Sequence, residues 1–329
     1  MRLPGLLLAA LLALALPRAA PAQPFEFVAF GDMPYCSPRA PEACPGEVAR
    51  VTALIAEINA ARPAFSIFLG DTKGGGEPCT EAIVFGRTLA WMGQVEGALI
   101  YTPGDNEWTD CWQARAGGHD PLALLAGIRE RFFPGPQSLG QAPIPLIRQA
   151  DVMPEHRLYV ENARWERNGV LFLTVHVPGS NNNLPLEGGP ARPEAAAEYA
   201  ARNRANLAWI AEGFALAARE GHRAVVVAMQ ADLYYRDRCG RGWVEGYLDT
   251  RRALAEGARR LGRPVLLLQG DSHSWWHDRP EPDLPNLTRI VVPGDGDTRA
   301  VLVTADPDAA EPFRFRLIGP ADRPAPPPC

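Results

Sequence analysis

Residues 67–71 read Ile-Phe-Leu-Gly-Asp, and the same pattern of an apolar run ending in glycine and aspartate occurs three more times. The other copies are Val28-Ala-Phe-Gly31-Asp32, Ile100-Tyr-Thr-Pro-Gly104-Asp105 and Leu266-Leu-Leu-Gln-Gly270-Asp271. Glycine lets the backbone turn sharply where a strand ends, and the crevice beyond such ends is where open α/β sheets bind ligands. The pattern predicts an α/β fold with aspartates in a shared crevice.

Four carboxylates in one crevice would repel one another unless a cation lies between them. The strand-end residues Asp32, Asp71, Asp105 and Asp271 therefore predict a metal site. The alternative is that Gly-Asp is ordinary turn chemistry. We prefer that alternative for Gly294-Asp295-Gly296-Asp297, which we expect to form a hairpin turn.

Apolar runs and helical periodicity predict the remaining elements. We expect strands at 25–30, 64–69, 99–102, 157–161, 170–177, 224–229 and 264–268, and helices at 46–61, 81–92, 121–132, 193–219 and 246–261. Strands at 287–292, 299–304 and 313–318 follow without helices, which predicts an antiparallel finish. We find no linker, so we expect one domain over residues 23–319 and a Pro-rich tail at 320–329.

The composition is that of a globular protein, with 47% hydrophobic and 22% charged residues among 329. A net charge of −5 argues against a protein that coats nucleic acid. Residues 1–22 are predicted to be a signal peptide, because Arg2, the apolar run Leu6–Leu16 and Ala20-Pro21-Ala22 follow in order. The run is shorter than the roughly 20 residues of a membrane span, so a membrane anchor is the less favoured alternative. We expect a periplasmic or secreted protein with no membrane span after cleavage.

Six cysteines in an exported chain suggest disulfides. Roughly 15 pairings are open to six cysteines. One set would be Cys36–Cys44, Cys79–Cys111 and Cys239–Cys329. A cysteine metal site is the less favoured alternative, because the chain has no Cys-x-x-Cys pair.

The order of the motifs resembles that of the calcineurin-like metallophosphoesterase superfamily. Its members carry Gly-Asp-x-His, a second Gly-Asp, Gly-Asn-His-Asp/Glu, a lone His after a strand, and Gly-His-x-His. This chain has, in that order, Gly31-Asp32-Met33-Pro34, Gly70-Asp71-Thr72-Lys73, Gly104-Asp105-Asn106-Glu107, Met229-Gln230 and Gly270-Asp271-Ser272-His273. The resemblance spans about residues 25–305 and implies a sandwich of two β-sheets flanked by helices. It also implies metal-dependent hydrolysis of a phosphate ester.

Only Asp32, Asp71 and His273 match the ligands of that superfamily directly. The other positions, where the superfamily has histidine or asparagine, hold Pro34, Asp105, Asn106, Gln230 and Asp271. The changes leave an oxygen-rich set, which suits Mg²⁺, Mn²⁺ or Ca²⁺ better than zinc. We expect one or two divalent ions and favour Mn²⁺ or Mg²⁺, with Ca²⁺, Fe and Zn²⁺ as alternatives.

The resemblance implies a role for each position. Asp71 would bridge two ions, and Asp32 and His273 would hold one of them. The other ion would be held by Asp105, Gln230 and Asp271.

Three further residues are candidates for acting on the substrate. Asn106 and Lys73, the only lysine among 33 basic residues, would steady the phosphate oxygens. His176 would protonate the leaving group. The alternative for Lys73 is a solvated loop lysine, and the alternative for His176 is a structural histidine.

A second hypothesis belongs to a different class of function. The chain would be a degenerate relative that binds a small phosphorylated ligand or a divalent cation without turnover. The loss of the usual histidines favours this hypothesis, and the four strand-end aspartates argue against it.

Overall fold

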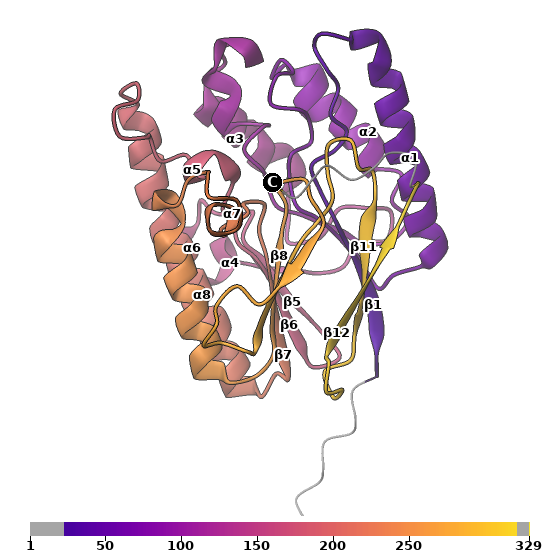
Figure 1. Cartoon of the computed structure of the whole chain (residues 1–329), viewed down its shortest axis with the longest axis vertical. Coiled ribbons are helices and arrows are strands. Elements are labelled where there is room, and N and C mark those ends of the chain that lie inside the picture. Colours follow the sequence, from indigo (N-terminus) through magenta and orange to yellow (C-terminus); the bar gives the residue numbers. More distant parts are fainter. Residues whose placement is uncertain (1–22, 321–328) are drawn as a thin grey trace, which may run out of the picture.

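The computed structural model describes residues 23–320 and residue 329, so the predicted signal peptide and most of the predicted tail lie outside the described residues. Two β-sheets lie face to face, and helices cover the outer face of each, as predicted (Figure 1). The five-stranded sheet has the order β12-β11-β1-β2-β3, with β1 (Phe25–Phe30), β2 (Ser66–Phe68), β3 (Leu99–Tyr101), β11 (Ala300–Ala305) and β12 (Phe313–Ile318). The seven-stranded sheet has the order β4-β5-β6-β7-β8-β10-β9, with β4 (Ile147–Arg148), β5 (Ala163–Arg167), β6 (Val170–Thr174), β7 (Ala224–Ala228), β8 (Val265–Gln269), β9 (Trp276–Asp278) and β10 (Leu287–Val291).

Each central strand contributes to two cores, because successive side chains of a strand point to opposite faces. In β1, Phe27 and Ala29 belong to the cluster between the two sheets, whereas Val28 and Phe30 belong to the cluster beneath the helices. Strands β7 and β8 alternate in the same way between the inter-sheet core and the second helical layer. Burial on both faces explains why these strands read as continuous apolar runs.

The helices form two outer layers. Helices α1 (Cys44–Ala61), α2 (Thr88–Met92) and α3 (Pro121–Phe132) cover the five-stranded sheet, and α6 (Pro193–Glu220) and α8 (Leu248–Leu261) cover the seven-stranded one. The short elements α4 (Gln149–Val152), α5 (Gly179–Asn182) and α7 (Tyr235–Cys239) lie in connecting loops. The helix predicted at 81–92 begins as a π-helical turn, Ala82–Arg87, and continues as α2.

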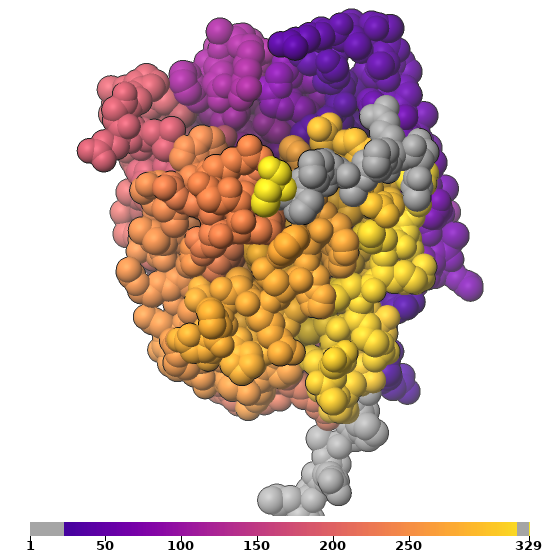
Figure 2. Space-filling model, in the orientation of Figure 1, coloured from indigo at the N-terminus to yellow at the C-terminus, as the bar shows by residue number. Residues whose placement is uncertain are grey.

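The last third of the chain contributes strands to both sheets, and these parts form one face of the molecule. In the space-filling view, the orange surface of residues from about 240 to 290 and the yellow surface of residues from about 300 to 320 are continuous (Figure 2). Among residues 23–320 and 329, the structure contains no helix that could cross a membrane.

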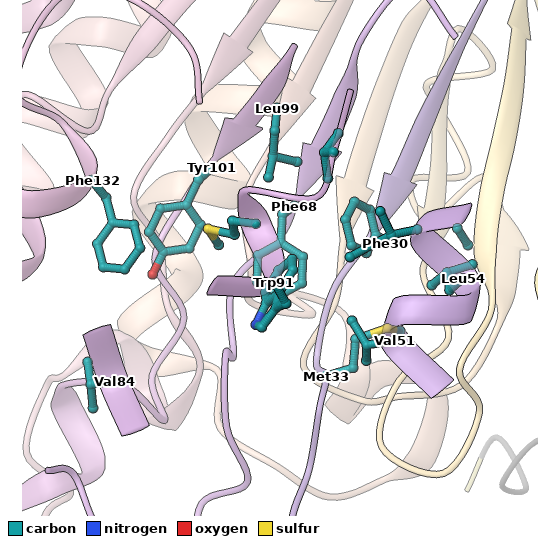
Figure 3. Close-up of a cluster of buried hydrophobic side chains, with 14 of the residues drawn as sticks. Phe30, Met33, Val51, Leu54, Phe68, Val84, Trp91, Leu99, Tyr101 and Phe132 are labelled. Carbon is teal, nitrogen blue, oxygen red and sulfur yellow. The ribbon is translucent and has the colours of Figure 1, made fainter. Parts of the chain in front are cut away.

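Aromatic side chains support the strand ends from the helical side. The rings of Phe68 and Trp91 lie 4.9 Å apart in a T-shaped arrangement, and Phe30 lies 6.3 Å from the same Trp91 ring (Figure 3). Tyr101, at the end of β3, packs against Phe132 of α3 at 5.2 Å. Such pairs contribute beyond their buried area, so β1, β2 and β3 end in a rigid setting.

Three predictions about the second half of the chain are wrong. Residues 157–161 form turns rather than a strand, because Leu158 is exposed and Glu161 turns inward to pair with Arg129; the strand lies at Ala163–Arg167. Strand β10 runs parallel to β8, so the finish is only partly antiparallel. Loop 294–297 is not a hairpin, because β10 and β11 belong to different sheets and the loop crosses between them.

Three disulfides have the pairing considered from the sequence: Cys36–Cys44, Cys79–Cys111 and Cys239–Cys329. The second ties the loop after β2 to the loop after β3, and its sulfurs lie 3.6 and 3.5 Å from the carbonyl oxygen of Asn106. The third joins the C-terminal residue to α7, near which Figure 1 marks the C-terminus. Disulfides of this kind are typical of proteins from oxidising compartments.

Candidate metal centre

The predicted metal ligands follow the carboxyl ends of parallel strands in both sheets. Asp32 and Asp71 follow β1 and β2, and Gln230 and Asp271 follow β7 and β8. Because the sheets face each other, these ends meet at one edge of the sandwich. The backbone N–H of Asp271 donates to Asp32 Oδ1 at 2.9 Å, a hydrogen bond that joins the two sheets at the site.

Three of the predicted ligands form a tight group. Asp32, Asp71 and His273 each offer a donor atom, and the three atoms lie within 4.8 Å of one another. Both aspartates are almost completely buried, and Asp32 Oδ2 has no hydrogen-bond partner among the described residues. A buried carboxylate oxygen left in this state is costly unless a cation satisfies it.

The carboxyl groups of the site oppose one another's ionisation. Burial raises the pKa of Asp32, and repulsion from Asp271 raises it further. Burial likewise raises the pKa of Asp71, with repulsion from Asp105 adding to it. Burial lowers the pKa of the His273 imidazole. A divalent cation needs charged carboxylates and a neutral imidazole. His273 already favours the neutral form, whereas the aspartates favour protonation that a bound cation would reverse.

The backbone at these aspartates is left-handed. Asp32, Asp71 and Asp271 have φ values of 55°, 59° and 69°. Such a conformation costs on the order of 1–3 kcal/mol per residue outside glycine and persists where the surroundings hold it. Gly104 is needed beside them, because a Cβ there would overlap the carboxylate of Asp71.

The other predicted ligands form a second group, held by hydrogen bonds. Gln230 Nε2 donates to Asp105 Oδ1 at 3.1 Å and to Asp271 Oδ1 at 3.4 Å. Gln230 Oε1 accepts from the backbone N–H of Gly179 at 2.5 Å. The hydroxyl of Ser180 donates to Asp105 Oδ2 at 2.7 Å. Ser180 has no role in the sequence analysis, although it lies in a polar loop just after β6.

Tyr35 is the main site residue that sequence reasoning missed. Its hydroxyl donates to Asp71 Oδ2 at 2.5 Å and lies 3.2 Å from His273 Nε2. The side-chain amide of Asn106 donates to the Tyr35 hydroxyl at 2.9 Å and to Asp71 Oδ2 at 2.6 Å. The available signal is position, since Tyr35 directly follows Pro34, which stands where the superfamily has a histidine.

Glu107 holds the loops after β2 and β3 in register. Its Oε1 accepts from the backbone N–H groups of Asp71 and Gly104 at 3.2 and 2.8 Å and from the Tyr101 hydroxyl at 2.8 Å. The last residue of the Gly104-Asp105-Asn106-Glu107 motif therefore positions the aspartates.

The structure does not support the predicted contact between Lys73 and a phosphate. The side chain is fully buried, and its Nζ donates to the carbonyl oxygen of Gly74 at 3.1 Å. Burial lowers the pKa of Lys73, while nearby Asp71 and Glu107 act in the opposite direction. A buried ammonium of this kind balances the charge of its neighbours and does not face a ligand.

The structure also gives His176 a structural setting. Its side chain is fully buried, and Nδ1 lies 2.9 Å from Oε1 of Glu161, which pairs with Arg129 at 2.6 Å. Burial lowers the pKa of His176 to about 4. A general acid must touch its substrate, and a residue without exposed surface does not meet that condition.

Arg238 is a largely buried cation beside the last motif, and no sequence pattern points to it. Its Nη2 donates to Ser272 Oγ at 3.1 Å, within the Gly270-Asp271-Ser272-His273 motif. Its Nε and Nη1 have no hydrogen-bond partner in the part of the chain that the structure describes. The guanidinium also lies 4.9 Å from the ring centre of Trp276. Nη2 also pairs with Asp232 Oδ2 at 3.1 Å, so Arg238 supports the motif loop from a largely buried position.

No protein-family model and no curated protein matches this chain. Among solved structures, a dimetal phosphatase from Danio rerio is similar, with a TM-score of 0.57 at 10% identity, over 91% of this chain and 99% of that one. A protein from Thermus thermophilus aligns with a TM-score of 0.45 at 12% identity, over 90% of this chain and 99% of its own. The likeness to the dimetal phosphatase shows that the chain has the metallophosphoesterase fold, as the order of the motifs predicts.

The donor set fits a divalent cation. Asp32 and Asp71 offer carboxylate oxygens and His273 an imidazole nitrogen, and these are the ligand types that Mn²⁺ and related ions accept. The unpartnered Asp32 Oδ2 is the atom that such an ion would satisfy.

Proposed function

We propose that this protein is an exported hydrolase that cleaves a small phosphate ester with the help of a divalent metal ion. The observation that carries the proposal is the convergence of Asp32, Asp71 and His273 at the strand ends of a dimetal phosphatase fold. The carboxylate-rich donor set favours Mn²⁺ or Mg²⁺. The three disulfides and the predicted signal peptide support a periplasmic or secreted location.

A bound divalent ion would supply positive charge to the phosphate oxygens and make a water molecule acidic enough to attack at neutral pH. Asp32, Asp71 and His273 would hold and orient that ion. His273 has 28% of its side chain exposed, so the substrate approaches from its side. Asn106 donates both hydrogens of its side-chain amide, one to Asp71 Oδ2 and one to the Tyr35 hydroxyl, so it positions Asp71 beside the site of the ion.

The test is Mn²⁺-dependent turnover of a panel of phosphomonoesters and phosphodiesters by the mature protein. Asp71→Asn should abolish turnover, because it removes a charged ligand. Asp283→Asn is the matched control, since this aspartate is 84% exposed and should leave turnover unchanged. Turnover that survives both Asp71→Asn and complete chelation would refute the proposal.

Binding without turnover is the second candidate function. It is favoured by the burial of Lys73 and His176, which leaves the described chain without the two helpers expected from the sequence. Calorimetry with inorganic phosphate, in the presence and absence of Mn²⁺, separates the two functions. Metal-dependent phosphate binding with no turnover of any ester on the panel would establish the binding protein.

A further inference from the structure

The two groups of predicted ligands differ in how their atoms are already engaged. In the first group, Asp32 Oδ2 is fully buried and has no hydrogen-bond partner among residues 23–320 and 329. In the second group, Asp105 and Asp271 both accept hydrogen bonds from the Gln230 amide, and Asp105 accepts another from Ser180. The first group therefore keeps one buried carboxylate oxygen that lacks a partner without a cation, whereas neutral donors satisfy the second group.

The orientation of the Gln230 amide is fixed by its neighbours. Its oxygen faces the backbone N–H of Gly179, and its NH₂ faces two carboxylates. Turning the amide over would set NH₂ against N–H and oxygen against carboxylates, and both contacts are repulsive. An NH₂ group cannot bind a metal, so Gln230 presents the wrong atom to the space between Asp105 and Asp271.

The loop after β6 covers the space between Asp105 and Asp271. A Cβ added to Gly179 would lie 2.8 Å from Asp105 Oδ1 and would also overlap Asp271 Oδ1. The backbone of Gly179 thus lies directly against both carboxylates. Together with the Ser180 hydroxyl, it takes the place where a second ion would need its own coordination sphere.

The first group gains a fourth donor that the superfamily pattern does not contain. The Tyr35 hydroxyl lies 2.5 Å from Asp71 Oδ2 and 3.2 Å from His273 Nε2, so its oxygen belongs to the same cluster of donor atoms. Pro34, at the usual histidine position, has no side-chain donor. The next residue along the chain supplies an oxygen in its place.

We propose that this chain binds one metal ion, that Tyr35 is its fourth protein ligand beside Asp32, Asp71 and His273, and that Asp105, Gln230 and Asp271 form a hydrogen-bonded wall. The inference rests on the proposed function only for the position of the metal. It departs from the expectation that Asp71 bridges two ions.

Metal content tests the first part. The mature protein is stripped with chelator, reconstituted with excess Mn²⁺, freed of unbound metal and measured by mass spectrometry. We expect one equivalent, and one equivalent again in Asp105→Asn. Two equivalents, falling to one in Asp105→Asn, would overturn the one-metal assignment while leaving hydrolysis intact.

Light absorption tests the second part, because tyrosine oxygen bound to Fe³⁺ absorbs visible light by charge transfer. The Fe³⁺-loaded protein should be coloured, and Tyr35→Phe should lose the band. We expect Tyr35→Phe to weaken Mn²⁺ binding by at least about 10-fold. Tyr234→Phe is the matched control, since its hydroxyl donates to Glu281 at 2.9 Å away from the group, and it should keep the band.

Iron-loaded protein without a visible band, or with a band that survives Tyr35→Phe, would overturn the assignment of Tyr35. These readouts do not depend on turnover. A coloured one-metal protein that hydrolyses nothing would support this inference and refute the proposed hydrolase. A protein that binds no metal would overturn both.

Discussion

Replacing Asp71 by asparagine should change the stability of the protein in opposite directions with and without metal. The ligand atoms of Asp32 and Asp71 lie within 4.8 Å of each other. Two full charges at that spacing repel by about 3.5 kcal/mol at an effective dielectric constant of about 20. This figure is a ceiling, because burial raises the pKa of both groups and the cluster retains protons.

Asp71 accepts three hydrogen bonds. The substitution removes the charged acceptor of the two that the Tyr35 and Asn106 side chains donate to Oδ2, while an amide oxygen at the Oδ1 position can still accept from the Asn106 backbone N–H. A hydrogen bond to a charged acceptor exceeds a neutral one by about 1 kcal/mol, so roughly 2 kcal/mol is lost. In chelator, Asp71→Asn should therefore raise the free energy of unfolding by at most about 1.5 kcal/mol. Mn²⁺ at about 100 times its dissociation constant should stabilise the wild type by about 2.7 kcal/mol, and this gain should be missing in the variant. The wild type should then be the more stable protein by about 1 kcal/mol.

Urea unfolding followed by tryptophan fluorescence at pH 7.5, in chelator and in Mn²⁺, measures both differences. Asp283→Asn, at an exposed position, should stay within about 0.5 kcal/mol of the wild type in both buffers. If Asp71→Asn is less stable than the wild type in chelator, Asp71 is a satisfied structural group. If Mn²⁺ leaves the wild type unchanged, the cluster does not bind this metal.

Three further predictions concern residues around the site. Burial lowers the pKa of His176 to about 4, below the ordinary 6.5, so the unfolded state binds the proton more tightly and this group removes stability as pH falls through 6.5 towards 4. Between pH 7 and pH 5 this residue should lower the free energy of unfolding by about 2 kcal/mol, and urea unfolding should show no such contribution in His176→Gln. The same pH dependence in both proteins would contradict the buried setting of His176. Arg238→Ala should raise KM for a phosphate ester about 10-fold with little change in kcat, because it removes the guanidinium that holds Ser272 and Asp232 behind the motif loop. The exposed Arg236→Ala on the same α7 is its control, and equal effects of the two variants would argue against this supporting role. Replacing both Cys79 and Cys111 by serine opens a loop with a sequence separation of 32 and should lower the free energy of unfolding by about 4 kcal/mol; a loss below about 1 kcal/mol would mean that the loops hold each other without the bond.

Much of the site framework could be predicted because it depends on local sequence. An apolar run of strand length followed by glycine and aspartate specifies both a buried strand and the direction in which its end points. Asp32 and Asp71 therefore come together as expected, on neighbouring parallel strands. The boundaries of β1 and α3 match the predictions for the same reason.

The remainder depends on tertiary contacts that a linear pattern does not encode. The parallel pairing of β10 with β8 is decided by which sheet edge is free. Residues 157–161 contain a short apolar run typical of a strand, but Glu161 turns inward to pair with Arg129 and the segment forms turns instead. The amide orientation of Gln230 is set by the Gly179 N–H, 51 residues away in sequence. Tyr35 was missed because the family pattern directs attention to the histidine position occupied by Pro34.

The backbone of the loop that covers the second group supports the proposal that Asp105, Gln230 and Asp271 form a closed wall. Four consecutive residues, Ser180 to Asn183, have φ values of 47°, 58°, 58° and 64°. Three of them are asparagines, which tolerate this conformation better than most residues, but the run still costs on the order of 1 kcal/mol or more per residue. Arg202 and Gly246 hold it through Asn182. The result is to seat Gly179 and Ser180 on Asp105. A chain that had simply lost a second metal would gain nothing from this strain. The strain in this loop is better explained if covering Asp105 and Asp271 keeps a second ion from binding beside the first.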